Sequence, residues 1–202
     1  MTAGGSDPSS TTLQTDHAKA QRVMLQATDL PGYDILPTSD AQPSSMKAAS
    51  GFESCAGAAA VLGDPERSVL SPAFLKGRTN AVSSLVIVAP SEGDAQSAMA
   101  SLGKSETAGC LTSLFRTALD LDLLPGTTAN TEAQPNPKVS DQSVMWRTTL
   151  QVATGGQSIP AYADLTFFRS GRTVGSLFNF QVGEPFPAAE RAKLLAAMVA
   201  RT

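Results

Sequence analysis

The chain has 202 residues, of which 42% are hydrophobic and only 16% charged, and its formal net charge is −3. This length suits one domain with a tail better than two domains. The acidic balance and the lack of a basic stripe disfavour nucleic-acid binding and membrane binding through a polybasic patch. The longest apolar run, residues 85–89, is also too short for a membrane-spanning helix.

Residues 1–14 are rich in Gly, Ser and Thr and are predicted to form a flexible tether, followed by a single α+β domain over residues 15–202. Such a stretch often follows a cleaved signal or a lipidated cysteine. Together with the low charge, it indicates an extracytoplasmic protein that reaches the membrane only through a lipid anchor. The alternative is a disordered native N-terminus.

The first half of the domain is predicted to contain helices and short strands. Thr15 is the expected N-cap of a helix that runs to about Thr28. Pro37 ends a short edge strand at Ile35 and Leu36. The segments that follow are a loop at 38–50, a helix at 51–62, and strands at 68–71, 73–75 and 82–89.

The second half begins with two helical runs. Ser91 and Asp94 form a capping-box pattern ahead of the first helix, and residues 110–119 carry apolar side chains at helical spacing. Residues 125–137 are predicted to be a loop, and residues 144–152 alternate as a strand.

Residues 161–182 are predicted to form a β-hairpin that turns at Ser170 and Gly171, so that Phe167 opposes Val174. One face of this hairpin is mostly apolar, and a last helix is expected at 187–200. The fold class is therefore predicted to be α+β, with an antiparallel β-sheet and α-helices packed on one face.

The other face of the hairpin region carries both apolar and polar side chains. Met145, Tyr162, Phe168 and Leu177 would form an exposed interaction patch if no other segment covered them. They would belong to the core if the N-terminal helices or the 38–50 loop lay over them.

The two cysteines, Cys55 and Cys110, favour a disulfide if the protein folds in an oxidising compartment. Closing this loop would stabilise the fold by about 4 kcal/mol in the chain-entropy model. The alternative is two unrelated buried thiols.

The sequence points to no catalytic residue, no metal site and no cofactor. His17 is the single histidine, so nucleophile systems that need a histidine base are disfavoured. Asp164 lies within a predicted strand, and both Arg147 and Arg169 are near enough in the expected topology to pair with it. It is expected to form a cross-strand ion pair, and the alternative is a ligand-binding carboxylate.

The helix ending at residues 29–32, the Phe-Glu-Ser-Cys run at 52–55, the strand at 82–89 and the Cys110 helix occur together, followed by antiparallel strands and a last helix. This layout, over residues 15–200, resembles actinobacterial secreted lipoproteins, including those like the extracellular sensor domain of a mycobacterial serine/threonine kinase. It is also similar to the Mog1/PsbP-type fold. The resemblance implies a binding or sensing module of the cell envelope.

We therefore expect a non-enzymatic extracytoplasmic domain that binds a small apolar ligand or an envelope protein partner. The candidate binding residues are Trp146, Arg147, Tyr162, Asp164 and Phe168. One alternative is a hydrolase or transferase that uses carboxylates alone, and another is a structural envelope subunit that acts through the hairpin edge.

Overall fold

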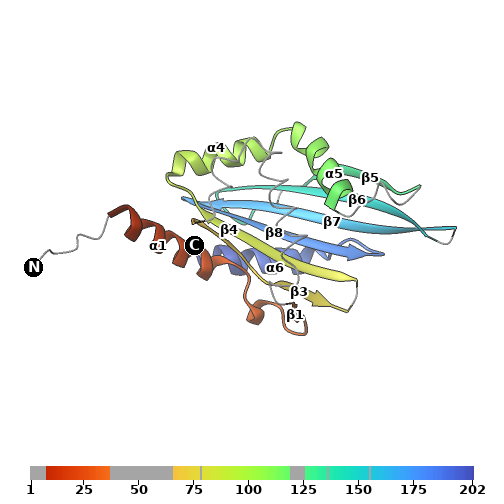
Figure 1. Cartoon of the computed structure of the whole chain (residues 1–202), viewed down its shortest axis with the longest axis horizontal. Coiled ribbons are helices and arrows are strands. Elements are labelled where there is room, and N and C mark those ends of the chain that lie inside the picture. Colours follow the sequence, from red (N-terminus) through yellow and green to blue (C-terminus); the bar gives the residue numbers. More distant parts are fainter. Residues whose placement is uncertain (1–7, 37–65, 78, 119–125, 136, 155) are drawn as a thin grey trace, which may run out of the picture.

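The computed structural model describes residues 8–36, 66–77, 79–118, 126–135, 137–154 and 156–202 (Figure 1). These residues form an eight-stranded antiparallel sheet and several helices, which confirms the predicted α+β class. The expected loop at 38–50 and helix at 51–62 lie outside the described residues.

The helical elements are α1 (Pro8–Val23), the 3-10 turn η1 (Ala27–Asp29), α4 (Glu92–Leu102), α5 (Glu106–Ala118) and α6 (Ala188–Val199). The strands are β1 (Asp34–Leu36), β2 (Ser68–Leu70), β3 (Ala73–Lys76), β4 (Asn80–Val88), β5 (Thr128–Gln134), β6 (Gln142–Thr154), β7 (Gln157–Ser170) and β8 (Thr173–Val182). The sheet order is β1-β3-β4-β8-β7-β6-β5, and β2 pairs with β4 beside this path.

Alternate residues of β7 define the two faces of the sheet. We call the face that carries Ala163 and Phe167 the first face, and the one that carries Asp164 and Phe168 the second face. Helices α4 and α5 pack on the first face, where Met99, Leu102 and Phe115 belong to the same buried cluster as Ala163 and Phe167. This side is the one that the sequence predicted to be covered.

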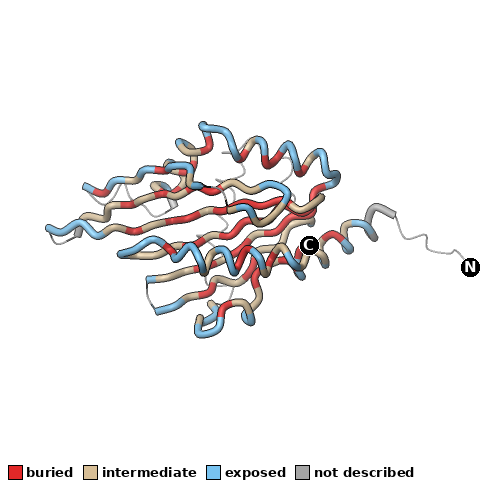
Figure 2. Tube along the Cα trace, turned by 180° about the vertical axis from the view of Figure 1, so that it is seen from behind, coloured by how far each residue is buried: buried red, intermediate tan, exposed pale blue. Residues whose placement is uncertain are grey.

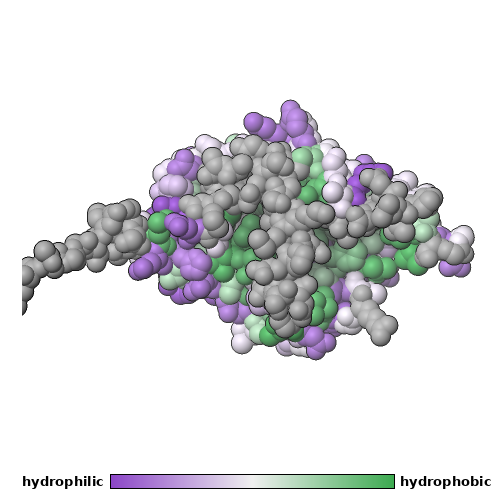
Figure 3. All heavy atoms as spheres, viewed as in Figure 1, coloured by the Kyte–Doolittle hydropathy of each residue, from purple (hydrophilic) through white to green (hydrophobic). Residues whose placement is uncertain are grey.

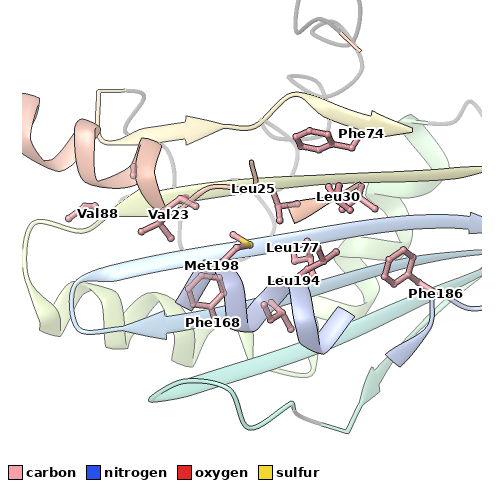
Figure 4. Packing of buried hydrophobic residues seen from close by; sticks show 14 residues of the cluster. Val23, Leu25, Leu30, Phe74, Val88, Phe168, Leu177, Phe186, Leu194 and Met198 are labelled. Carbon is pink, nitrogen blue, oxygen red and sulfur yellow. The ribbon is translucent and has the colours of Figure 1, made fainter. Parts of the chain in front are cut away.

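The prediction that helices pack on one face only is wrong. Helices α1 and α6 pack on the second face, where Val23, Leu194 and Met198 cluster with Phe168 and Leu177 (Figure 4). Figure 2 shows α6 in front of the strands, on the side opposite to the view of Figure 1. The molecule therefore has three layers, because both sheet faces carry enough apolar side chains to bind a helix.

The first-face helices follow their sequence signals closely. Ser91 caps α4, since its Oγ accepts a hydrogen bond of 3.1 Å from the backbone N–H of Asp94. The buried side of α4 consists of Ala95, Ala98, Met99 and Leu102. Seen from the side of Figure 1, hydrophobic residues show mainly in the inner part of this face and hydrophilic ones mainly around the outline (Figure 3).

The hairpin of β7 and β8 is present, but its predicted register is wrong. The loop residues are Gly171 and Arg172, so Ser170 pairs with Thr173 and Phe167 pairs with Ser176. Gly171 has a φ of +56° and takes the first loop position, which needs a left-handed residue. The pairing is displaced by two residues, so every side chain stays on its predicted face.

Strand β5 replaces most of the loop that was predicted at 125–137. Its sequence, Thr-Ala-Asn-Thr-Glu-Ala-Gln, lacks an apolar alternation because β5 is an edge strand with mostly exposed side chains. Thr131 is its buried exception, and its Oγ1 lies 2.8 Å from that of Thr148 on β6. Pairing with β6 therefore determines this strand more than its own composition does.

Helix α1 starts and ends earlier than predicted. It begins at Pro8, so residues 8–14 are helical, and Thr15 is an interior residue rather than the N-cap. It ends at Val23, because Leu25 turns into the core and its backbone N–H donates to Ser84 Oγ at 2.9 Å.

A buried carboxylate attaches α1 to the sheet. Asp16 Oδ2 accepts hydrogen bonds from Arg67, beside β2, and from Arg172 in the β7–β8 loop, the latter at 2.7 Å. Asp16 is only 4% exposed. Both contacts join α1 to segments that are distant in the sequence, so they fix its position on the second face.

Replacing Asp16 with Asn is expected to lower the free energy of unfolding by about 2 kcal/mol, because two charge-assisted hydrogen bonds are weakened. Amide hydrogen exchange should increase in α1 before it increases in the central strands. Urea denaturation and exchange measurements test this, with the exposed Asp34→Asn as the control. Equal effects of the two substitutions would contradict this role of Asp16.

A second ion pair joins the turn η1 to the C-terminus. Arg201 donates to both carboxylate oxygens of Asp29, at 2.9 and 2.8 Å, and the backbone N–H of Gln26 also donates to Asp29. Burial acts to raise the pKa of Asp29, but the hydrogen bonds from Arg201 and Gln26 outweigh it and lower the pKa below its ordinary value of 3.8.

Because the folded-state pKa of Asp29 is depressed, the pair stabilises the fold above the unfolded-state pKa. This contribution is lost as the pH falls through the folded-state pKa. Asp29→Asn should therefore destabilise the protein at neutral pH, and the deficit should shrink below about pH 4. Urea unfolding of both proteins from pH 7 to pH 2.5 tests this, and a deficit that stays constant over that range would contradict it.

Candidate functional site

The five candidate binding residues do not form one site. Trp146 lies on the first face in the core under α4, 4% exposed, and its indole Nε1 donates to the backbone O of Leu102 at 3.0 Å. Phe168 is fully buried on the second face under α6. Both aromatic side chains are therefore part of the hydrophobic core.

The other three candidates lie together on the second face. Arg147 on β6 is opposite Asp164 on β7, and its Nε and Nη2 donate to the two carboxylate oxygens at 2.6 and 2.8 Å. The guanidinium carbon of Arg147 also lies 5.8 Å from the ring centroid of Tyr162. The predicted cross-strand ion pair is present.

A third residue, which no sequence pattern indicated, joins this ion pair. Arg191 Nη1, from α6, donates to Asp164 Oδ2 at 2.8 Å and lies 3.4 Å from the backbone O of Phe186. We call Arg147, Asp164 and Arg191 the Asp164 triad. Since α6 crosses the second face, one helical turn places Arg191 above the sheet while Leu194 and Leu195 fill the core.

The Asp164 triad is desolvated and carries a formal charge of +1. The side chains of Asp164, Arg191 and Arg147 are 1%, 12% and 19% exposed. Hydrogen bonding to Asp164 raises the pKa of Arg147, whereas burial lowers the pKa of Arg191. Both guanidinium groups stay protonated at physiological pH, so the triad presents a fixed positive charge beside Tyr162.

A set of polar side chains surrounds the Asp164 triad on the second face. Asn179 on β8 lies opposite Asp164, Gln181 lies opposite Tyr162, and Asn80 on β4 lies opposite Gln181. Thr166 follows two residues after Asp164 on the same face. We call this set the polar row, and its members are Asn80, Tyr162, Thr166, Asn179 and Gln181.

Several atoms of the polar row are buried without a hydrogen-bond partner in the described part of the chain. They are Asn80 Oδ1, Thr166 Oγ1, Asn179 Oδ1, Asn179 Nδ2 and Gln181 Oε1. An unsatisfied buried polar group costs about 1–3 kcal/mol, so folded proteins contain few of them. The signal available from the sequence was a run of amides on the polar side of β8, which a solvent-exposed strand would also show.

Cys110 lies in α5 and is not a free thiol. Its expected partner, Cys55, lies outside the described residues, so the pairing of these two cysteines stays a prediction.

Two shallow surface grooves lie along α1, away from the Asp164 triad. The first is lined by Ala18, Gln21, Arg22, Gln26 and Arg201, and the second by Leu13, Gln14, His17, Ala18, Gln21 and Glu66. Among the described residues, no group of three or more His, Cys, Asp and Glu side chains could hold a metal ion. No helix within the described ranges is long and apolar enough to cross a membrane.

Comparison with known proteins finds a structural likeness but no match in sequence. No protein-family model matches the chain, and no curated protein matches it. A solved structure, the extracellular domain of PknH from Mycobacterium tuberculosis, is similar with a TM-score of 0.37 and 11% sequence identity. The match covers 64% of this chain and 62% of that chain, so this chain spans less than two thirds of that domain.

Proposed function

We propose that this chain is a non-enzymatic binding or sensor-like domain of the cell envelope. Its binding surface is the part of the second face formed by Arg147, Tyr162 and the polar row. In this proposal Asp164 orients Arg147 and Arg191 beside the ligand. The domain binds the ligand and catalyses no reaction of it.

The observation that supports this proposal is the complete engagement of Asp164. Both of its carboxylate oxygens accept hydrogen bonds from arginines. Both oxygens therefore face arginines rather than a substrate, a geometry that does not suit a general base. The same bonds hold Arg147 and Arg191 in fixed orientations, which lowers the entropic cost of binding. The carboxylate-based hydrolase and the structural subunit stay predictions from the sequence.

The arrangement favours a small polar ligand at this surface over an apolar one. Phe168 and Trp146, which would have supplied apolar contacts, are engaged in the core. The apolar neighbours on this face, Met145 and Leu177, are also buried, whereas Tyr162, Gln181 and Asn80 are only half-buried.

An envelope location fits the low share of charged residues and the absence of a free thiol at Cys110. We include a Cys55–Cys110 disulfide and a lipid anchor before the domain in the proposal. A thiol assay on unreduced, denatured protein is expected to detect no free thiol. After reduction the same assay should detect two free thiols. Two free thiols before reduction would contradict the disulfide.

Ligand-observed NMR with a mixed set of probes tests the proposed function. The set contains neutral hexoses, carboxylates, phosphate, amines and a medium-chain fatty acid. At least one class is expected to bind to the wild-type protein and to bind much more weakly to Arg147→Gln. The exposed Arg22→Gln in α1 serves as the matched control and should leave binding unchanged.

The Arg147→Gln protein must stay folded for this comparison, which its circular dichroism spectrum would establish. Binding of no probe class, or binding that both substitutions leave intact, would contradict the proposed function at this surface.

A further inference from the structure

The most unusual residue on the second face is Asn179. Its side chain is 0% exposed, and both of its carboxamide atoms lack a hydrogen-bond partner among the described residues. Thr166, also 0% exposed, has an unpartnered hydroxyl two residues from Asp164. Asn179 lies directly opposite Asp164 in the β7–β8 ladder, so both groups adjoin the Asp164 triad.

The polar row continues from Asn179 to the surface. Gln181 and Asn80 each keep a buried, unpartnered carbonyl oxygen, although both residues are only half-buried as a whole. Tyr162, opposite Gln181, is half-buried as well. Tyr162, Gln181 and Asn80 are therefore the members of the polar row that solvent reaches in part.

The chemistry of the unpartnered atoms identifies what they would bind. Three of them are carbonyl oxygens of amides, which only accept hydrogen bonds, one is an amide N–H₂ donor, and one is a hydroxyl that does both. A carboxylate or phosphate brings no donor when fully ionised, so it would leave the three oxygens unpaired. An apolar ligand would leave all of them unpaired, and the formal charge of +1 on the triad disfavours a cation.

We propose that the polar row and the Asp164 triad form a binding site for an uncharged ligand rich in hydroxyl groups, that is, a saccharide. Hydroxyl groups donate and accept, so they can satisfy the amides of Asn80, Asn179 and Gln181 together with the Thr166 hydroxyl. The half-buried ring of Tyr162 offers an apolar surface for the C–H face of a sugar. This inference rests on the proposed function and names the ligand class of the same surface.

The test uses substitutions that remove the polar atoms and keep the shape of the side chain. Asn179→Leu and Thr166→Val each delete an unpartnered buried group. Thr173→Val is the matched control, because Thr173 is also 0% exposed with an unpartnered hydroxyl. It lies six residues from Asn179 along β8, which is about 20 Å in a strand.

Isothermal titration calorimetry with glucose, mannose and galactose, and with glucuronate and inorganic phosphate, measures binding to each protein. At least one neutral hexose is expected to bind the wild type, and Asn179→Leu and Thr166→Val should each weaken it about tenfold or more. Thr173→Val should leave the affinity unchanged. All three substitutions should leave the melting temperature unchanged or raised, because each removes an unsatisfied buried group.

Two results would overturn this inference. Binding of glucuronate or phosphate without any neutral hexose would refute the saccharide and leave the proposed function standing. The second result is that no probe binds and that all three substitutions raise the melting temperature alike. The unpartnered atoms would then only contact trapped water, and both the saccharide site and the proposed function would be refuted.

Discussion

Replacing Asp164 with Asn is expected to lower the free energy of unfolding by about 3 kcal/mol, the lower end of the range for breaking a buried ion pair. The substitution leaves Arg147 and Arg191, 19% and 12% exposed, with no carboxylate to neutralise them. The carboxamide of Asn is uncharged and has one acceptor oxygen, so it can keep at most two of the three hydrogen bonds, and its NH₂ group faces a guanidinium. Urea denaturation at pH 7 measures the loss.

Glu92→Gln is the matched control for this experiment. Glu92 also pairs with a buried arginine, Arg169, at 3.1 Å, but its own side chain is 59% exposed. Glu92→Gln should lower the free energy of unfolding by less than about 1 kcal/mol, as is usual for exposed ion pairs. Similar losses for the two substitutions would contradict the view that the Asp164 triad is desolvated.

Replacing Gly175 with Ala should cost about 2–3 kcal/mol of unfolding free energy. A Cβ atom at this position would lie 2.3 Å from Cζ of Phe168, the residue directly opposite on β7. The ring of Phe168 is fully buried beneath α6, so it cannot move away without disturbing the core. Thermal and urea unfolding both report this loss.

Gly109→Ala serves as the control, because a Cβ there meets no atom within 4 Å. Gly109 lies inside α5, so this substitution should stabilise the helix by up to about 1 kcal/mol. Phe168→Leu combined with Gly175→Ala should be less harmful than the sum of the two single substitutions, by about 1 kcal/mol or more. If the losses in unfolding free energy of Phe168→Leu and Gly175→Ala are additive, Gly175 is not needed to make room for the Phe168 ring.

Much of the fold could be predicted because its elements carry strong periodic signals. The alternation of apolar and polar residues predicted strands β6 and β7, and the capping residue Ser91 predicted the start of α4. Strand β5 could not be found in this way, since its pattern of Thr, Asn and Glu reflects an edge position and pairing with β6. Periodicity also indicates which side of a helix is apolar, but not which sheet face it will cover, so the second-face position of α6 was missed.

The candidate site was predictable to the extent that its parts are neighbours in the sheet. Arg147 and Arg169 were both expected near Asp164, because the same hairpin and its neighbouring strand carry them. Arg147 does pair with Asp164, whereas Arg169 instead binds Gln142 and Glu92. Arg191 is 27 residues from Asp164 on a separate helix, and only tertiary packing brings them together. Asn179 could be placed on the second face, but its burial depends on what covers that face, which no local pattern specifies.

The most direct test of the account is to map ligand binding onto the protein by backbone amide NMR, with the tightest-binding probe from the mixed set. The account predicts chemical-shift changes concentrated at residues 162–166 of β7 and 179–181 of β8, with little change in α1 or α4. Changes centred on the grooves along α1, or on the α4 and α5 side of the sheet, would contradict it.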